Sequence, residues 1–342
     1  MHQKLNICLQ GLRFGEPRRH ERLTVLPLFS DGVPGPNYVT LSQALAQGEC
    51  RVTEVDEKGS VPNLKVENNG DRPVLLLDAE ELVGAKQNRV LNTTILVRAK
   101  STTFVPVSCT EAGRWSYTSP EFADARTAMY ASLRHMKMSS VSASLKSSRT
   151  YGSNQQKIWE EIALFSAMAG AHSPTGAMHE VYRSQDKSLE EYEKALPLKE
   201  GQQGLLVLLG NRVVGLDYVS RPKAFAELYP KLLKSYALDA LFSKEEQKPD
   251  DPEKSARDFF EKAASLEESI HPSVAWGDDY RFTGEGLVGS ALEVEGAVIH
   301  LSLLRREKPD FPKTAKPHEP PAQSKEQEKV GAKTGWRRWF GR

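Results

Sequence analysis

Short apolar runs alternate with dense polar clusters between Pro73 and Trp115. The apolar runs, such as residues 74–77, have the length of strands that are buried on both faces. The polar clusters fall where these runs end, and they are rich in side chains that make several hydrogen bonds. Polar residues at the ends of packed strands are typical of the rim of a binding or catalytic site. We therefore expect the functional site of the chain in this stretch.

Many short strands joined by turns are predicted before residue 110. We expect an edge strand near residues 5–9, firmer strands at residues 23–29 and 50–55, and a short helix over residues 41–47 that Gly48 closes. This pattern favours an antiparallel sandwich, jelly roll or barrel.

The spacing of apolar positions becomes helical after Trp115. Ser119 followed by Pro120 has the composition of a helix start, with serine as the N-cap and proline in the first turn. A capping-box pattern at residues 153–156 predicts another helix. We interpret residues 119–197 as a helical insertion between two β segments.

The remaining pattern predicts a return to the sheet and then further helices. Residues 205–219 have the composition of a hairpin, residues 222–242 are helical, and Asp251 caps another helix. A final β section is expected at residues 280–304. The fold class is therefore α+β, with an antiparallel β-rich sandwich or jelly-roll-like core, a helical insertion and additional C-terminal helices.

We expect one mixed, β-rich domain over residues 1–306. Residues 307–342 are rich in proline, lysine, glutamate and glutamine without periodicity, which is typical of a disordered tail. The tail ends in an aromatic and basic tip from Trp336 to Arg342. This tip has the composition of a short docking peptide, and it makes a protein the candidate partner of the tail.

Composition and charge exclude several classes of protein. The chain has 46 Lys+Arg against 45 Asp+Glu, so no strong field recruits nucleic acid. Its three cysteines are widely spaced and indicate neither a disulfide framework nor a zinc site. No apolar run reaches membrane-spanning length, and residues 1–12 lack the apolar region of a signal peptide. A cytoplasmic protein without a membrane span is expected.

The candidate site begins with two acidic residues and a run of donors. Glu80 and Glu81 are adjacent, so on a strand they point to opposite faces, and we take them as candidate general bases. Arg89 has the geometry to bind a phosphate or carboxylate with two hydrogen bonds. A solvated loop with surface ion pairs is the alternative. The candidate ligand-binding residues of this run are Lys86, Gln87, Asn88, Arg89 and Asn92.

A second polar group follows the next predicted strand. Glu111, Arg114 and Trp115 are candidate ligand-binding residues at the same rim, with Trp115 suited to stacking on a base or sugar. Packing of Trp115 in the core is an equal alternative. Cys109 is better interpreted as a small buried residue than as a nucleophile, because no base is evident beside it.

Other motifs carry less weight. The eight histidines are scattered, so we expect no bound metal and no cofactor. Residues 284–289 match G-x-G-x-x-G, but a strand rather than a helix is predicted after them, which argues against a phosphate loop. Residues 125–159 contain six basic residues and no acidic one before Glu160, among many serines. They indicate either an exposed flexible insertion or a segment that closes on a phosphorylated ligand.

The run from Pro73 to Arg98, with residues 105–109 and 111–115, resembles the ARG and rhodanese-phosphatase-superfamily-associated protein domain. Residues 153–159 and 214–219 are similar to the same family. The resemblance implies an uncharacterised bacterial family that is associated with ADP-ribose and NAD-derived metabolism. It supplies no catalytic residues.

Two functions follow as hypotheses. The first is a small-molecule binding protein, with an ADP-ribose-like or other phosphorylated nucleotide as ligand and with hydrolysis as a further step. Lys86, Arg89 and Arg114 would meet the phosphates. The second is a non-catalytic binding or adaptor module that docks through its C-terminal tip. Whether the protein is an enzyme stays open at this point.

Overall fold

The computed structural model describes residues 3–56, 59, 62–245, 247–284 and 286–306. The expected disordered tail and its aromatic tip lie outside the described residues. The fold is α+β with antiparallel, β-rich cores, which confirms the predicted class. Among the described residues, no helix combines the length and the apolar character that crossing a membrane requires.

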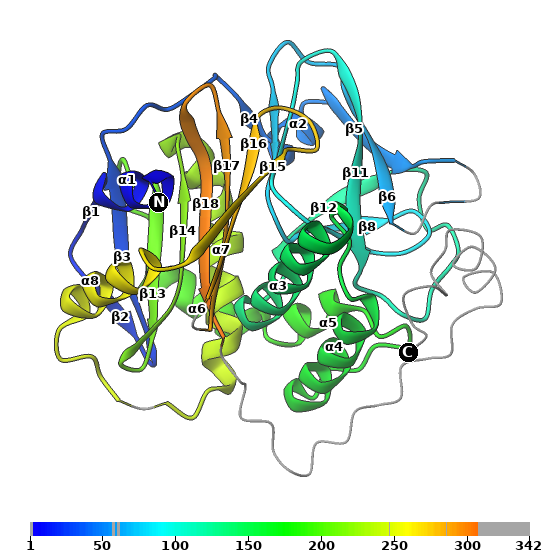
Figure 1. The fold of residues 1–342 in the computed structure, drawn as a ribbon. Coiled ribbons are helices and arrows are strands. Elements are labelled where there is room, and N and C mark those ends of the chain that lie inside the picture. The colour runs from blue at the N-terminus through cyan, green and yellow to red at the C-terminus, as the bar shows by residue number, and fades with distance from the viewer. Residues whose placement is uncertain (1–2, 57–58, 60–61, 246, 285, 307–342) are drawn as a thin grey trace.

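A nine-stranded antiparallel sheet forms the larger half of the molecule (Figure 1). The hairpin predicted at residues 205–219 is present at its centre, and residues 295–296 form the turn of a second hairpin, which joins the last two strands of the chain. In spatial order the strands are β1 (Leu12–Phe14), β3 (Leu23–Ser30), β13 (Gly204–Leu209), β14 (Arg212–Val219), β18 (Ala297–Arg305), β17 (Leu287–Val294), β16 (Asp278–Gly284) and β15 (Glu267–Pro272), with β2 (Arg18–His20) paired to β3.

Two smaller sheets form the other half. A three-stranded sheet has the order β10 (Ile95–Val97), β7 (Val74–Leu76) and β4 (Val39–Thr40), with β4 parallel to β7. The six-stranded sheet has the order β12 (Phe122–Ala128), β8 (Glu80–Gly84), β9 (Arg89–Leu91), β11 (Ser101–Cys109), β6 (Asn63–Asn68) and β5 (Cys50–Glu54). This sheet curls until its edge strands β5 and β12 touch, and Arg51 donates to Glu121 across the seam at 2.8 Å.

Helices cover both faces of the nine-stranded sheet. Residues Leu5 and Leu9 of α1 pack with Phe259 of α8 on one face, while α3, α4 and α7 share an apolar core with the other face. The bounds of the helices are α1 (Gln3–Gln10), α2 (Leu41–Ala46), α3 (Ala131–Ser148), α4 (Gln155–Ala169), α5 (Met178–Ser184), α6 (Asp186–Ala195), α7 (Pro222–Phe242) and α8 (Pro252–Ala263).

Two local predictions are wrong. Residues 5–9 form part of α1 rather than an edge strand, because Leu5 and Leu9 face the sheet while Ile7 is exposed. The helical insertion starts at Ala131, since residues 122–128 form strand β12. Ser119 lies in the irregular connection before β12, where its hydroxyl accepts from the amide of Ala85 at 3.0 Å. Ser119 followed by Pro120 therefore does not begin a helix.

The basic, serine-rich segment is ordered rather than a flexible insertion. It forms the end of β12, all of α3 and the start of α4. Arg134 and Lys137 of α3 are fully buried. Arg134 pairs with Asp217 of β14, and Lys137 pairs with Asp78 after β7. Helix α3 is therefore fixed between the large sheet and the smaller sheets.

Candidate functional site

Several strands of the six-stranded sheet end at the same place. Strands β5, β8 and β11 end there, while β6, β9 and β12 begin there, as their antiparallel pairing requires. The connections over residues 84–89 and 109–121 cover this end. They contain most of the residues that the sequence singles out, so the structure brings these residues together.

Arg89 is the first residue of β9 at this end of the sheet, and it is fully buried. Its Nη1 donates to Oε1 of Gln87 at 2.5 Å and to Sγ of Cys109 at 3.1 Å. Its Nε and Nη2 make no hydrogen bond to any described residue. A buried guanidinium with unused donors is costly, which makes it a candidate position for a ligand group or water. Burial raises the pKa of the Cys109 thiol to about 11, so the thiol is protonated at neutral pH.

Trp115 covers the Arg89 guanidinium. The centre of the Arg89 guanidinium lies 5.5 Å from the centroid of the Trp115 ring, and Nζ of Lys86 is also 5.5 Å from it. Lys86 lies 5.0 Å from the centroid of the exposed Tyr117 ring as well. Contacts at these distances are cation–π interactions. The arrangement places two cations within 5.5 Å of the centre of one large aromatic ring.

Glu54 belongs to the same site, although the sequence analysis did not select it. Its carboxylate accepts from the amide of Lys86 at 3.4 Å through Oε1, whereas Oε2 makes no hydrogen bond to the described residues. Burial raises the pKa of Glu54, with the charge of Arg89 acting in the opposite direction. The available signal was its position, since Cys50, Val52 and Glu54 share the inward face of β5. We call Glu54, Lys86, Arg89, Cys109 and Trp115 the Arg89 cluster.

Glu111 and Arg114 hold together the two connections that cover this end of the sheet. Glu111 accepts from Nε of Arg114 at 2.9 Å and from the hydroxyl of Thr175 at 2.6 Å, and Arg114 donates to Oδ1 of Asn88 at 2.9 Å. Gln87 donates to the carbonyl of Glu111. Burial alone would raise the pKa of Glu111, but the bonds from Arg114 and Thr175 outweigh burial and lower it. These side chains thus position the loops around the Arg89 cluster.

Glu80 lies apart from the cluster. It is fully buried and accepts from Nζ of Lys231 on α7, which also donates to Asp124 at 2.7 Å. Its other oxygen accepts from the amide of Leu77 at 3.2 Å. Burial raises the pKa of Glu80, and Lys231 opposes this effect. The two oxygens of Glu80 therefore serve to join α7 to the start of β8.

Glu81 faces the side of the sheet opposite to Arg89, because Leu82 rather than Glu81 is paired with Arg89. It accepts from the hydroxyls of Thr110 at 2.9 Å and Thr127 at 2.8 Å. His179 at the start of α5 has its Nδ1 3.8 Å from Oε2 of Glu81 and is partly exposed. The nearby carboxylate of Glu81 raises the pKa of His179.

Asn92 lies at the other end of β9. Its amide donates to the carbonyl of Tyr151 at 2.8 Å, and its oxygen accepts from Ser108 at 2.6 Å. Thus the structure brings together Lys86, Gln87, Asn88, Arg89, Glu111, Arg114 and Trp115. It separates Glu80, Glu81 and Asn92 from them.

The fold and site define an α+β protein with a buried arginine and a tryptophan at the end of a curled antiparallel sheet. A family model, the ARG and Rhodanese-Phosphatase-superfamily-associated Protein domain, matches residues 11–304, and the chain belongs to this family. The expected resemblance is confirmed. No curated protein and no solved structure gives a significant match.

Proposed function

We propose that the protein binds a phosphorylated, ADP-ribose-like nucleotide at the Arg89 cluster. The observation that carries the proposal is the buried Arg89 guanidinium, whose Nε and Nη2 make no hydrogen bond within the described chain. A phosphate oxygen is an acceptor for such donors, and its charge compensates that of the arginine. The association with ADP-ribose metabolism that the family resemblance implies points to the same class of ligand.

Each member of the cluster has a role in this proposal. Arg89 binds the phosphate, and Lys86 adds a second positive charge from the rim. The Trp115 ring stacks on the base or sugar, as aromatic side chains do in nucleotide sites. Glu54 accepts a ribose hydroxyl through Oε2, which makes no hydrogen bond to the described residues. Arg114 acts indirectly, since its guanidinium is bonded to Glu111 and Asn88.

Binding, rather than hydrolysis, is the activity that we propose first. The oxygens of Glu80 and Glu81 are engaged by internal donors, and the two side chains lie on opposite faces of β8. A general base must reach the proton that it removes. Of the two carboxylates, Glu81 is the stronger proposal for acid–base chemistry, because its partner His179 is partly exposed.

A thermal-shift titration with ADP-ribose, AMP and NAD tests the proposal. Ligand that binds only the native state raises the melting temperature by mass action. We expect a shift with ADP-ribose in the native protein, and its loss in Trp115→Ala and Arg89→Met. Because Arg89 is buried, folding of each variant is checked first by circular dichroism. Arg13→Ala, at an exposed ion pair with Asp31, is the control with one lost positive charge.

Two results would contradict the proposal. The first is the absence of a shift with every nucleotide in the native protein. The second is an unchanged shift in folded Trp115→Ala and Glu54→Gln variants. The latter result would show that nucleotide binds elsewhere on the protein.

A further inference from the structure

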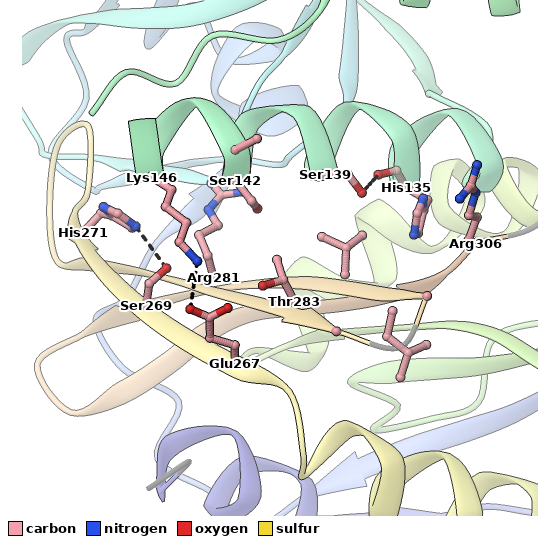
Figure 2. Close-up of a pocket in the computed structure, with 15 residues that line it drawn as sticks. His135, Ser139, Ser142, Lys146, Glu267, Ser269, His271, Arg281, Thr283 and Arg306 are labelled. Carbon is pink, nitrogen blue, oxygen red and sulfur yellow. Dashed lines mark hydrogen bonds and ion pairs between the residues drawn. The ribbon is translucent and has the colours of Figure 1, made fainter. Parts of the chain in front are cut away.

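A separate cavity of about 460 Å³ lies between α3 and the strands β15, β16 and β17 (Figure 2). One wall is formed by α3, and the floor is formed by the strands β15, β16 and β17 at one edge of the nine-stranded sheet. It shares no residue with the Arg89 cluster. A volume of this size accommodates a small metabolite.

Arg281 of β16 lines this cavity and is almost fully buried. Its Nε and Nη2 donate to the carboxylate of Asp279 at 2.5 and 2.8 Å, and Nη2 also donates to the hydroxyl of Thr93 at 2.6 Å. Nη1 makes no hydrogen bond to the described residues. The guanidinium is therefore fixed on one side by Asp279 and has a donor left for a ligand. In Figure 2 its side chain rises from the sheet toward Ser142.

A second donor lies on the opposite wall. The hydroxyl of Ser142 on α3 is buried, lines the cavity and makes no hydrogen bond to the described residues. Ser269 and Thr283 add further hydroxyl groups to the lining, whereas the hydroxyl of Ser139 already donates to the carbonyl of His135 at 2.8 Å. Hydroxyl and guanidinium donors that converge from two elements match the several acceptor oxygens of one phosphate group.

The charges around the cavity favour an anion. Lys146 pairs with Glu267 at 2.9 Å, and Arg281 pairs with Asp279, so these four charges balance. Arg306 adds a positive charge at the end of β18, where its amide donates to the carbonyl of Gly286. Among the described lining residues, lysine and arginine outnumber aspartate and glutamate by three to one.

We propose that this cavity binds the phosphate group of a small phosphomonoester. Arg281 and Ser142 donate to the phosphate from the floor and the α3 wall, and Arg306 supplies the compensating charge. The organic part of the ligand contacts Leu287 and Val288. The site is independent of the function proposed for the Arg89 cluster.

Gly284 and Gly286 line the cavity beside the start of β17. Residues 284–289 carry the G-x-G-x-x-G string, in which Gly284 ends β16 and Leu287 begins β17, so a strand and not a helix follows the first glycines. Gly286 has a φ of +76°, and a Cβ atom added there would meet no atom within 4 Å. The glycine is thus explained by its backbone conformation. The phosphate in this proposal is bound by side chains rather than by a dinucleotide loop.

The test is isothermal titration calorimetry with ribose 5-phosphate, and with ribose as the matched probe that lacks the phosphate. We expect saturable binding of ribose 5-phosphate and none of ribose. Arg306→Ala should weaken binding by about ten-fold or more, as expected for loss of a charged partner. Ala143→Phe, on the exposed side of α3, should abolish binding by filling the cavity. Arg13→Ala should bind like the native protein.

Unchanged melting temperatures of Arg306→Ala and Ala143→Phe show that these variants fold. The inference fails if ribose binds as well as ribose 5-phosphate, if the native protein binds neither, or if both folded variants bind ribose 5-phosphate normally. A variant of the Arg89 cluster, Trp115→Ala, separates the two proposals. It should lose the ADP-ribose shift and keep the binding that Arg306→Ala weakens.

Discussion

Arg134 of α3 and Asp217 of β14 form a fully buried ion pair with two hydrogen bonds, of 3.0 and 2.5 Å. Tyr236 of α7 donates to the same carboxylate at 2.7 Å, and His300 of β18 lies 3.6 Å from it. Burial alone would raise the pKa of Asp217, but Arg134 and His300 outweigh burial and hold it far below its usual range. One carboxylate thus joins two helices to two strands of the large sheet.

Removing one partner of this pair should destabilise the protein strongly. We expect Arg134→Met to lower the free energy of unfolding by about 3–5 kcal/mol, because it leaves the Asp217 charge buried without its main partner. Chemical denaturation measures the change. The control is Lys254→Ala, which removes an exposed ion pair with Asp258 and should cost less than about 1 kcal/mol. An equally small effect of Arg134→Met would contradict the interpretation of this pair.

Stability should fall in acid partly through Glu111. Its folded-state pKa lies below the ordinary value of 4.5, so its contribution is present above pH 4.5 and is lost as the pH falls through the folded value. Denaturation curves between pH 7 and pH 3 should show this loss. In Glu111→Gln the decline should be shallower, and stability at pH 7 should be lower by about 1–2 kcal/mol. Parallel pH profiles for the two proteins would contradict the assignment.

The proton affinity of His179 should depend on Glu81. The pKa of His179 is raised above 6.5 by the nearby carboxylate of Glu81, so this pair contributes stability below pH 6.5 that is lost as the pH rises through the folded value. An NMR titration of the ring protons should give a pKa above 6.5 in the native protein. In Glu81→Gln the value should fall. The same value in both proteins would show that the pair does not interact.

Deleting residues 307–342 separates ligand binding from docking through the tail. All the residues of the Arg89 cluster, and all those that line the cavity between α3 and the strands β15 to β17, lie before residue 307. We expect the truncated protein to keep its melting temperature within about 2 °C and to keep both ligand responses. Loss of a protein partner with unchanged ligand binding would favour an additional adaptor role. Loss of ligand binding would contradict the boundaries of both proposed sites.

Local pattern and turn chemistry were enough to predict much of the fold. The hairpin around Gly210 and the helix cap at Asp251 are present as predicted, since each depends on residues adjacent in sequence. The alternation of Leu5, Ile7 and Leu9 fits a strand, whereas Leu5 and Leu9 alone also have the spacing of one helix face. Packing of Leu5 and Leu9 on the large sheet decides for the helix, and no local signal contains that packing.

Long-range ion pairs were beyond the reach of sequence patterns. Arg134 and Lys137 look like surface residues in the sequence, because their partners Asp217 and Asp78 are 83 and 59 residues away along the chain. For the same reason Glu54 was missed at the candidate site. The run from Lys86 to Arg89 was found because its members are adjacent and follow a predicted strand.

Strand β9 connects the two proposed sites. Arg89 is its first residue, and Thr93, whose hydroxyl binds Arg281, lies just past its end. The strand has three residues and so spans roughly 10 Å, and bends at Asn92 and Thr93 follow it. The strand is hydrogen-bonded to β8 and β11 on its two sides. By thermodynamic linkage, any influence of one ligand on the affinity for the other must act equally in both directions.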